Sequence, residues 1–141
     1  MALVLTTSRR TNAKQEQIIK DLLAACDIES HIIIANENNP DYAVNGILGL
    51  SDIVIVSSES ISMASEAVAS EKPVIVYKGK KKIKSKSKYE FFLDNLEKLG
   101  CLKQVDNLNS LNMDDLIQNI KVIDSKQYNE NFSKAMERLK I

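Results

Sequence analysis

The sequence predicts an α/β protein, a Rossmann-like three-layer sandwich with a mainly parallel sheet of about five strands and helices on both faces. Short apolar segments alternate with segments whose apolar residues recur every three to four positions, which is typical of strand–helix–strand units with right-handed crossovers. Polar turn residues separate these segments. Because the chain has 141 residues, 44% of them apolar, it can bury one core, and we expect a single domain over residues 1–141.

The N-terminal part of the chain predicts two strand–helix units. Residues 3–6 are a short apolar strand, and a polar turn leads from it to a helix over 13–26. The apolar stripe of this helix is formed by Ile18, Ile19, Leu22, Leu23 and Cys26. Residues 31–35 are a second strand, continuous in isoleucine as expected where both faces of a sheet are covered. Turn residues over 36–40 precede a short helix near 42–50.

The rest of the chain continues this alternation. A strand over 53–56 leads through a serine-rich turn to a helix over 60–69, and Pro73 precedes a strand over 74–77, where a proline removes no ladder hydrogen bond. A further helix starts near Tyr89 and ends at Gly100, a left-handed C-cap. The remaining predicted elements are an edge strand over 102–105 and C-terminal helices from about residue 112, over 113–123 and 129–139.

Composition excludes several classes of partner and site. Lys plus Arg equals Asp plus Glu at 19 each, so we expect no nucleic-acid partner. Cys26 and Cys101 lack metal-like spacing and the N-terminus lacks a signal-peptide pattern, which predicts a reducing, cytoplasmic location. No apolar run approaches the roughly 20 residues that cross a bilayer. His31 has no second ligand near it in sequence, so we predict neither a metal site nor a cofactor.

The loop after the first predicted strand offers groups that bind phosphate. It contains Thr7, Ser8, Arg9 and Arg10. Ligands of an open parallel sheet bind beyond the carboxyl ends of its strands, and arginine makes bidentate contacts with phosphate oxygens. We therefore predict that these residues contact a diphosphate. The alternative is a solvated turn that caps the following helix.

The serine-rich turn before the helix over 60–69 is the second candidate site. Unpaired N–H groups at a helix start attract phosphate. The residues assigned to phosphate on this basis are Ser58, Ser60, Ile61, Ser62 and Met63. Glu66 shares one side of the helix with Ser62, opposite the apolar side, so its carboxylate could accept the hydroxyl protons of a ribose. The alternative is that Ser60 is only an N-cap and Glu66 a solvated helix residue.

Charged clusters elsewhere give weaker indications. The lysine-rich loop over 78–88 could meet an anionic acceptor or a lipid head group, and we expect no more than a weak peripheral membrane contact there. The alternative is a solvated loop. Asp114 and Asp115 lie in the first turn of a predicted helix, where acidic groups favour the helix dipole, and we interpret them as structural.

Three motifs resemble a known family when taken in order. TTSRRT at 6–11, NPDY at 39–42 and LGLSDIVIVSSESISMASEAVASEKPVIV at 48–76 look like the mitochondrial-fission ELM-type family. Members of that family show a TSRRT turn, an NPY segment, a DSVSM-SEA helix and a GKPV strand. Here Glu59 replaces the usual aspartate, Asp41 interrupts NPY, and Glu71 stands where glycine is usual. The resemblance extends from Thr6 to about Leu102.

That family is similar to the carboxyl-terminal, donor-binding half of GT-B glycosyltransferases. The resemblance implies that Glu66 binds the ribose and residues 60–63 the diphosphate of a nucleotide diphosphate sugar. It also implies an N-terminal GT-B-like domain that this chain lacks, and hence no catalytic residue and no transfer activity from the chain alone. The competing hypothesis is a noncatalytic interaction or membrane-associating module that keeps the fold. A phosphosugar epimerase-like domain fits least, since it would need more than one histidine.

Overall fold

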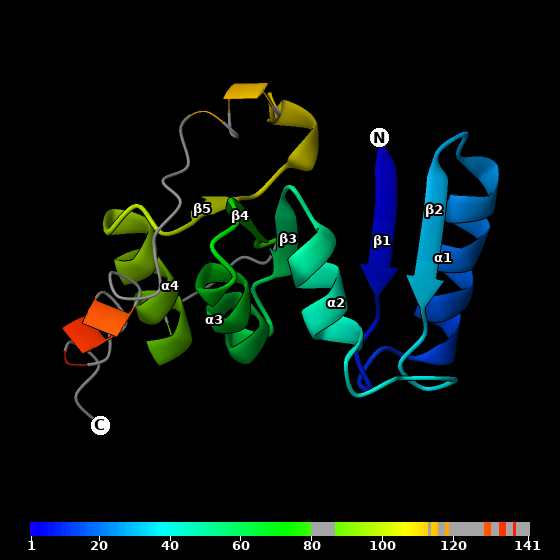
Figure 1. Ribbon diagram of the computed structural model, residues 1–141, viewed down its shortest axis with the longest axis horizontal. Helices are drawn as coiled ribbons and strands as arrows, with labels where there is room; N and C mark the ends of the chain where they lie inside the picture. The colour runs from blue at the N-terminus through cyan, green and yellow to red at the C-terminus, as the bar shows by residue number, and fades with distance from the viewer. Residues whose placement is uncertain are drawn as a thin grey trace. The chain divides into compact units, whose positions relative to one another are not determined.

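The computed structural model describes residues 1–79 and 87–112 and, beyond these ranges, residues 114, 115, 118, 129, 130, 133, 134 and 137. It is an α/β chain that divides into two compact units, Met1–Leu50 and Ser51–Ile141, which we describe separately (Figure 1). The predicted α/β class, about five strands and parallel pairing are confirmed. The strands form one sheet of two and one of three. That the whole chain is a single domain stays a prediction.

The first unit contains a two-stranded parallel sheet. Strand β1 (Ala2–Thr6) pairs in register with β2 (Glu29–Ile33), from Ala2 opposite Glu29 to Thr6 opposite Ile33. Figure 1 shows the two strands as arrows that point the same way. Helix α1 (Ala13–Ala25) connects them, and α2 (Ala43–Leu50) is the last element of the unit along the chain. Because the strands are parallel, the loops that follow them leave the same edge of the sheet.

Local sequence explains where α1 begins. Asn12 has an extended backbone, and its side chain accepts a hydrogen bond from the Gln15 N–H at 2.9 Å. The Gln15 side chain in turn accepts from the Asn12 N–H at 3.1 Å, which completes a capping box. Two of the amides that an α-helix leaves unpaired at its start are therefore satisfied by the chain itself.

Strand β2 begins two residues before the prediction. We expected residues 31–35, but the ladder with β1 covers Glu29–Ile33. The isoleucine run marks the apolar part of the segment, whereas hydrogen bonding to β1 decides where the strand begins and ends. Ile34, just beyond the ladder, is buried.

The second unit contains a three-stranded parallel sheet in the order β3-β4-β5. Its strands are β3 (Val54–Ser57), β4 (Val74–Tyr77) and β5 (Lys103–Val105). Helix α3 (Ile61–Ala69) lies against β3 and β4, and α4 (Lys88–Lys98) lies against β5. A short 3-10 helix follows at Leu108–Ser110. The core is formed by residues with almost no exposed surface: Ala64, Ala67, Val74, Ile75, Val76, Leu93 and Leu96.

Two predictions fall partly or wholly on residues outside the described part of the chain. Of the lysine-rich loop over 78–88, residues 80–86 are not among the described residues. Most residues of the C-terminal helices predicted over 113–123 and 129–139 are not described either. Within the described residues, no helix is both long and apolar enough to cross a membrane.

The ends of α3 and α4 adopt the left-handed backbone in two different ways. Gly100 follows α4 with φ 78°, its N–H donates to the Glu97 carbonyl, and the Cys101 N–H donates to the Leu96 carbonyl, both at 2.9 Å. This is a Schellman motif, and it confirms the predicted C-cap. Glu71 follows α3 with φ 62°, although it carries a Cβ. The backbone at position 71 therefore favours glycine, the residue that the motif resemblance leads one to expect there.

We expect Glu71→Gly to raise the free energy of unfolding by about 0.5–1 kcal/mol, because glycine has no Cβ penalty in the left-handed region. The matched opposite change, Gly100→Ala, should lower it by about 1–2 kcal/mol for the same reason. Urea denaturation followed by circular dichroism measures both variants. A Glu71→Gly variant that is less stable than the starting protein would contradict this reading of the α3 C-terminus.

Candidate functional site

The polar turn after β1 is organised by its own side chains. The Ser8 N–H donates to Thr11 Oγ1 at 3.1 Å, and the Arg10 N–H donates to Ser8 Oγ at 3.2 Å. The Thr11 N–H donates to the Ser8 carbonyl at 3.0 Å. These bonds connect Ser8, Arg10 and Thr11 across the turn. Arg9 and Arg10 are exposed, and neither forms an ion pair with another residue in the part of the chain that the structure describes.

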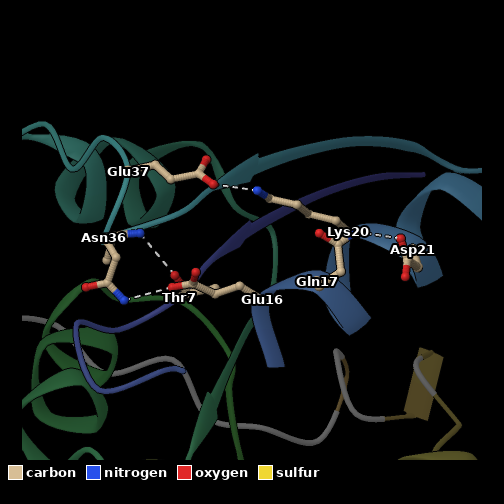
Figure 2. Close-up of polar contacts among 8 residues, drawn as sticks. Thr7, Glu16, Gln17, Lys20, Asp21, Asn36 and Glu37 are labelled. Carbon is tan, nitrogen blue, oxygen red and sulfur yellow. Dashed lines mark hydrogen bonds and ion pairs between the residues drawn. The ribbon is translucent and has the colours of Figure 1, made fainter. Parts of the chain in front are cut away.

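Thr7 connects this turn to the loop after β2. Its N–H donates to the Ile33 carbonyl at 3.1 Å, which extends the ladder by one residue. Its side-chain Oγ1 accepts the Ala35 N–H at 3.0 Å (Figure 2). The predicted site residue Thr7 therefore joins the two loops at the carboxyl edge of the sheet.

Two residues that the sequence analysis did not single out complete this corner. Asn36 Nδ2 donates to Glu16 Oε1 at 2.8 Å and to the Thr11 carbonyl at 3.0 Å. Glu16 lies in the first turn of α1 and is only 8% exposed, the one charged or polar side chain found buried among the described residues. Figure 2 shows Asn36 beside Glu16 and Thr7. The loop after β2 is thus anchored to both the turn and the helix that follow β1.

Burial of Glu16 changes the interpretation of the apolar stripe of α1. Ile18 is 48% exposed and Leu22 is 61% exposed, whereas Ile19 and Leu23 are half-buried. Glu16 precedes Ile19 by three positions and Leu23 by seven, so it shares their side of the helix. A carboxylate aligned with the half-buried apolar residues was the signal in the sequence that could have identified it.

A second contact between α1 and this loop is more exposed. Lys20 Nζ lies 2.5 Å from Glu37 Oε1, as Figure 2 shows, but the two side chains are 36% and 59% exposed. Exposed ion pairs contribute about 0–1 kcal/mol to stability. This pair therefore adds little to the stability of the corner compared with the buried Glu16–Asn36 contact.

The first turn of α3, in the second unit, is not capped by a side chain. Ser60 has the extended backbone of an N-cap, but its side chain forms no capping hydrogen bond. By contrast, Asn12 and Ser87 each form a complete capping box at the start of α1 and α4. The N–H groups of the first turn of α3 are consequently not occupied by the cap residue, and they lie just beyond the carboxyl end of β3.

The two faces of α3 are as predicted. Ser62 and Glu66 are exposed, whereas Ala64, Ala67 and Val68 are buried. Met63 is half-buried, and Ser65 Oγ donates to the Ile61 carbonyl at 3.0 Å. The Ser58 N–H donates to the Tyr77 carbonyl at 3.0 Å, so this predicted site residue also extends a strand ladder. Within its own unit, Glu66 therefore projects from the side of α3 that carries Ser62.

Metal ligands do not gather in the part of the chain that the structure describes. There, no three side chains of His, Cys, Asp or Glu lie close enough together to hold an ion. His31, on β2, is exposed.

Both units present polar turns at the carboxyl ends of parallel strands, which is where doubly wound α/β proteins bind their ligands. The chain belongs to the mitochondrial fission ELM1 family, whose model matches residues 1–131. This confirms the resemblance predicted from the motifs at 6–11, 39–42 and 48–76. Neither a curated protein nor a solved structure matches the chain.

Replacing Thr7 by valine should lower the free energy of unfolding by about 1–2 kcal/mol, because the Ala35 N–H would lose its acceptor. Thr7→Ser, which keeps the oxygen, is the matched control and should cost less. Chemical denaturation gives the stability, and hydrogen exchange at the Ala35 amide reports the bond directly. Equal stability of the two variants, with the Ala35 amide still protected in Thr7→Val, would exclude a contribution from this hydrogen bond.

Proposed function

We propose that this chain binds the diphosphate of a nucleotide sugar, as the donor-binding domain of a glycosyltransferase-like protein. The observation that carries the proposal is the uncapped first turn of α3, where Ser60 makes no side-chain capping bond. Backbone N–H groups at such a position attract phosphate oxygens, and the helix dipole favours their charge. The proposal assigns the diphosphate to residues 60–63 and the ribose hydroxyls to Glu66, which is exposed one turn into the helix.

The turn after β1, in the first unit, by itself carries groups that suit phosphate. Arg9 and Arg10 are exposed on a turn whose own hydrogen bonds hold its backbone. An arginine held on an ordered turn loses less conformational freedom when it binds phosphate than one on a disordered segment. Family membership adds the resemblance to GT-B donor domains that the motifs imply. We place the binding in the cytoplasm, in keeping with the cysteine spacing, and assign no catalytic residue.

Removing one amide from α3 tests the main assignment. Ile61→Pro deletes the first N–H of the helix, and proline suits this position because Ser60 before it is extended, with φ −114° and ψ 93°. We expect uridine diphosphate to bind this variant roughly tenfold more weakly, as for the loss of one charge-assisted hydrogen bond. Ile61→Ala, which keeps the N–H, is the matched control. Isothermal titration calorimetry measures the affinities.

Failure of the proposal would be visible in the same experiments. If 15N spectra of the unmodified chain show no shifts at Ile61, Ser62 or Met63 with millimolar uridine diphosphate, the α3 assignment is wrong. Equal affinities of Ile61→Pro and Ile61→Ala would also argue against it.

Neutralising the arginine turn tests whether the first unit itself contributes to phosphate binding. Arg9→Ala and Arg10→Ala should each weaken binding of uridine diphosphate by roughly tenfold or more, and the loss should shrink as salt is raised. Lys14→Ala removes an exposed positive charge from the start of α1 and is the matched control. Should Lys14→Ala weaken binding as much as the arginine variants, the effect is one of general charge rather than of this turn.

The alternative function, a noncatalytic interaction or membrane-associating module, depends on the lysine-rich loop over 78–88. At the described ends of this loop, Lys78 Nζ lies 3.7 Å from Asp106 Oδ1, and Lys88 Nζ lies 5.4 Å from the centre of the Tyr89 ring. Both lysines thus contact the protein itself, and we place this function second. Cosedimentation with anionic vesicles that is lost on neutralising Lys80 to Lys84, together with an absence of nucleotide binding, would favour it.

A further inference from the structure

We propose that Asn36 Oδ1 is a hydrogen-bond acceptor for a donor group of the ligand held by the arginine turn, and that buried Glu16 is the positioning residue that orients it. This inference rests on the proposed function. It adds a specificity-determining residue that neither the motifs nor the family match assigns. It concerns the first unit alone.

The hydrogen bonds of Asn36 decide which way its amide faces. Nδ2 carries two protons, and they are directed to Glu16 Oε1 at 2.8 Å and to the Thr11 carbonyl at 3.0 Å. A carbonyl can only accept, so the reversed amide would place Oδ1 against the Thr11 carbonyl oxygen. Oδ1 must therefore face the other way, and Figure 2 shows it directed away from Glu16 and Thr7. Asn36 is an exposed residue.

The buried position of Glu16 costs free energy. A buried carboxylate costs free energy unless it is hydrogen-bonded, and at 8% exposure Glu16 is shielded from most of the solvent. Its position in the first turn of α1 is favoured by the helix dipole, and Asn36 satisfies Oε1. An apolar side chain would pack beside Ile19 and Leu23 without this cost. The carboxylate thus contributes something that packing alone does not require, and the contact it makes is with Asn36.

The position of Asn36 suits a ligand bound at the turn. Its Nδ2 contacts the carbonyl of Thr11, which directly follows Arg9 and Arg10 in the chain. The two arginines supply only donors and positive charge, which recognise any phosphate. An amide oxygen on the loop that contacts this turn accepts from a hydroxyl or N–H group. The arginines and this acceptor together favour a phosphate that carries a nucleoside or sugar over a bare phosphate, because the nucleoside or sugar has a hydroxyl or N–H group to donate.

This division of roles predicts a difference between two ligands. Asn36→Ala removes the acceptor and should weaken binding of uridine diphosphate about three- to tenfold, as for one neutral hydrogen bond, while binding of inorganic pyrophosphate changes less than about twofold. Glu16→Leu should show the same pattern with a smaller loss, because the amide remains but is held by its bond to the Thr11 carbonyl alone. Lys20→Ala, which breaks the exposed Lys20–Glu37 pair beside the same loop, is the matched control and should change neither affinity.

Isothermal titration calorimetry with both ligands on the four proteins separates the outcomes. Equal weakening of both ligands by Asn36→Ala means that Asn36 only supports the turn, and unchanged affinity for both means that it takes no part; either result overturns the inference while leaving the proposed function intact. Failure of the unmodified chain to bind either ligand overturns the proposed function and this inference with it. Hydrogen exchange at the Ser8, Arg10 and Thr11 amides shows whether each variant keeps the turn.

Discussion

Parallel pairing of β1 with β2 is the constraint on which the arrangement of the first unit depends. The register runs from Ala2 opposite Glu29 to Thr6 opposite Ile33, and Thr7 continues it by one more bond. Because the strands point the same way, both following loops emerge at one edge, and Thr7 Oγ1 can accept the Ala35 N–H. Only then do the amide of Asn36, the carbonyl of Thr11 and the carboxylate of Glu16 lie within hydrogen-bonding distance.

The second unit also depends on parallel strand pairing, but the helix after its first strand begins differently. Its sheet also directs a loop beyond the carboxyl end of a strand, but the helix that follows begins without a side-chain cap. Ser60 is a residue type that caps well, and Ser87 does so at the start of α4, so the difference lies in local geometry and not in residue type. A first turn whose amides are not bonded to the cap residue keeps a partial positive charge that attracts an anion. In α1 and α4, by contrast, a first-turn amide donates to the side chain of the cap residue.

Sequence reasoning succeeded where a pattern repeats along one element. The buried and exposed sides of α3 follow from its spacing, and the C-cap at Gly100 follows from one residue type at one position. It was wrong about the bounds of β2, since hydrophobicity marks the apolar residues of a strand while its partner sets its ends. It also did not single out Glu16 or Asn36. A carboxylate near a helix start usually means a solvated group that favours the dipole, and for Glu16 only its alignment with Ile19 and Leu23 indicates otherwise.

By itself, the sequence determined the α/β class, the alternation of strands and helices, the family and the polar turns that follow the strands, because each depends on neighbouring residues or on a short period. Only the tertiary structure decided that Glu16 is buried and that Asn36 presents a particular face of its amide. Those properties come from hydrogen bonds between residues 20 and 25 positions apart, which exist only once the two strands have paired. Propensity and spacing describe a chain one segment at a time, whereas the orientation of a side chain between two loops requires both loops to be in place.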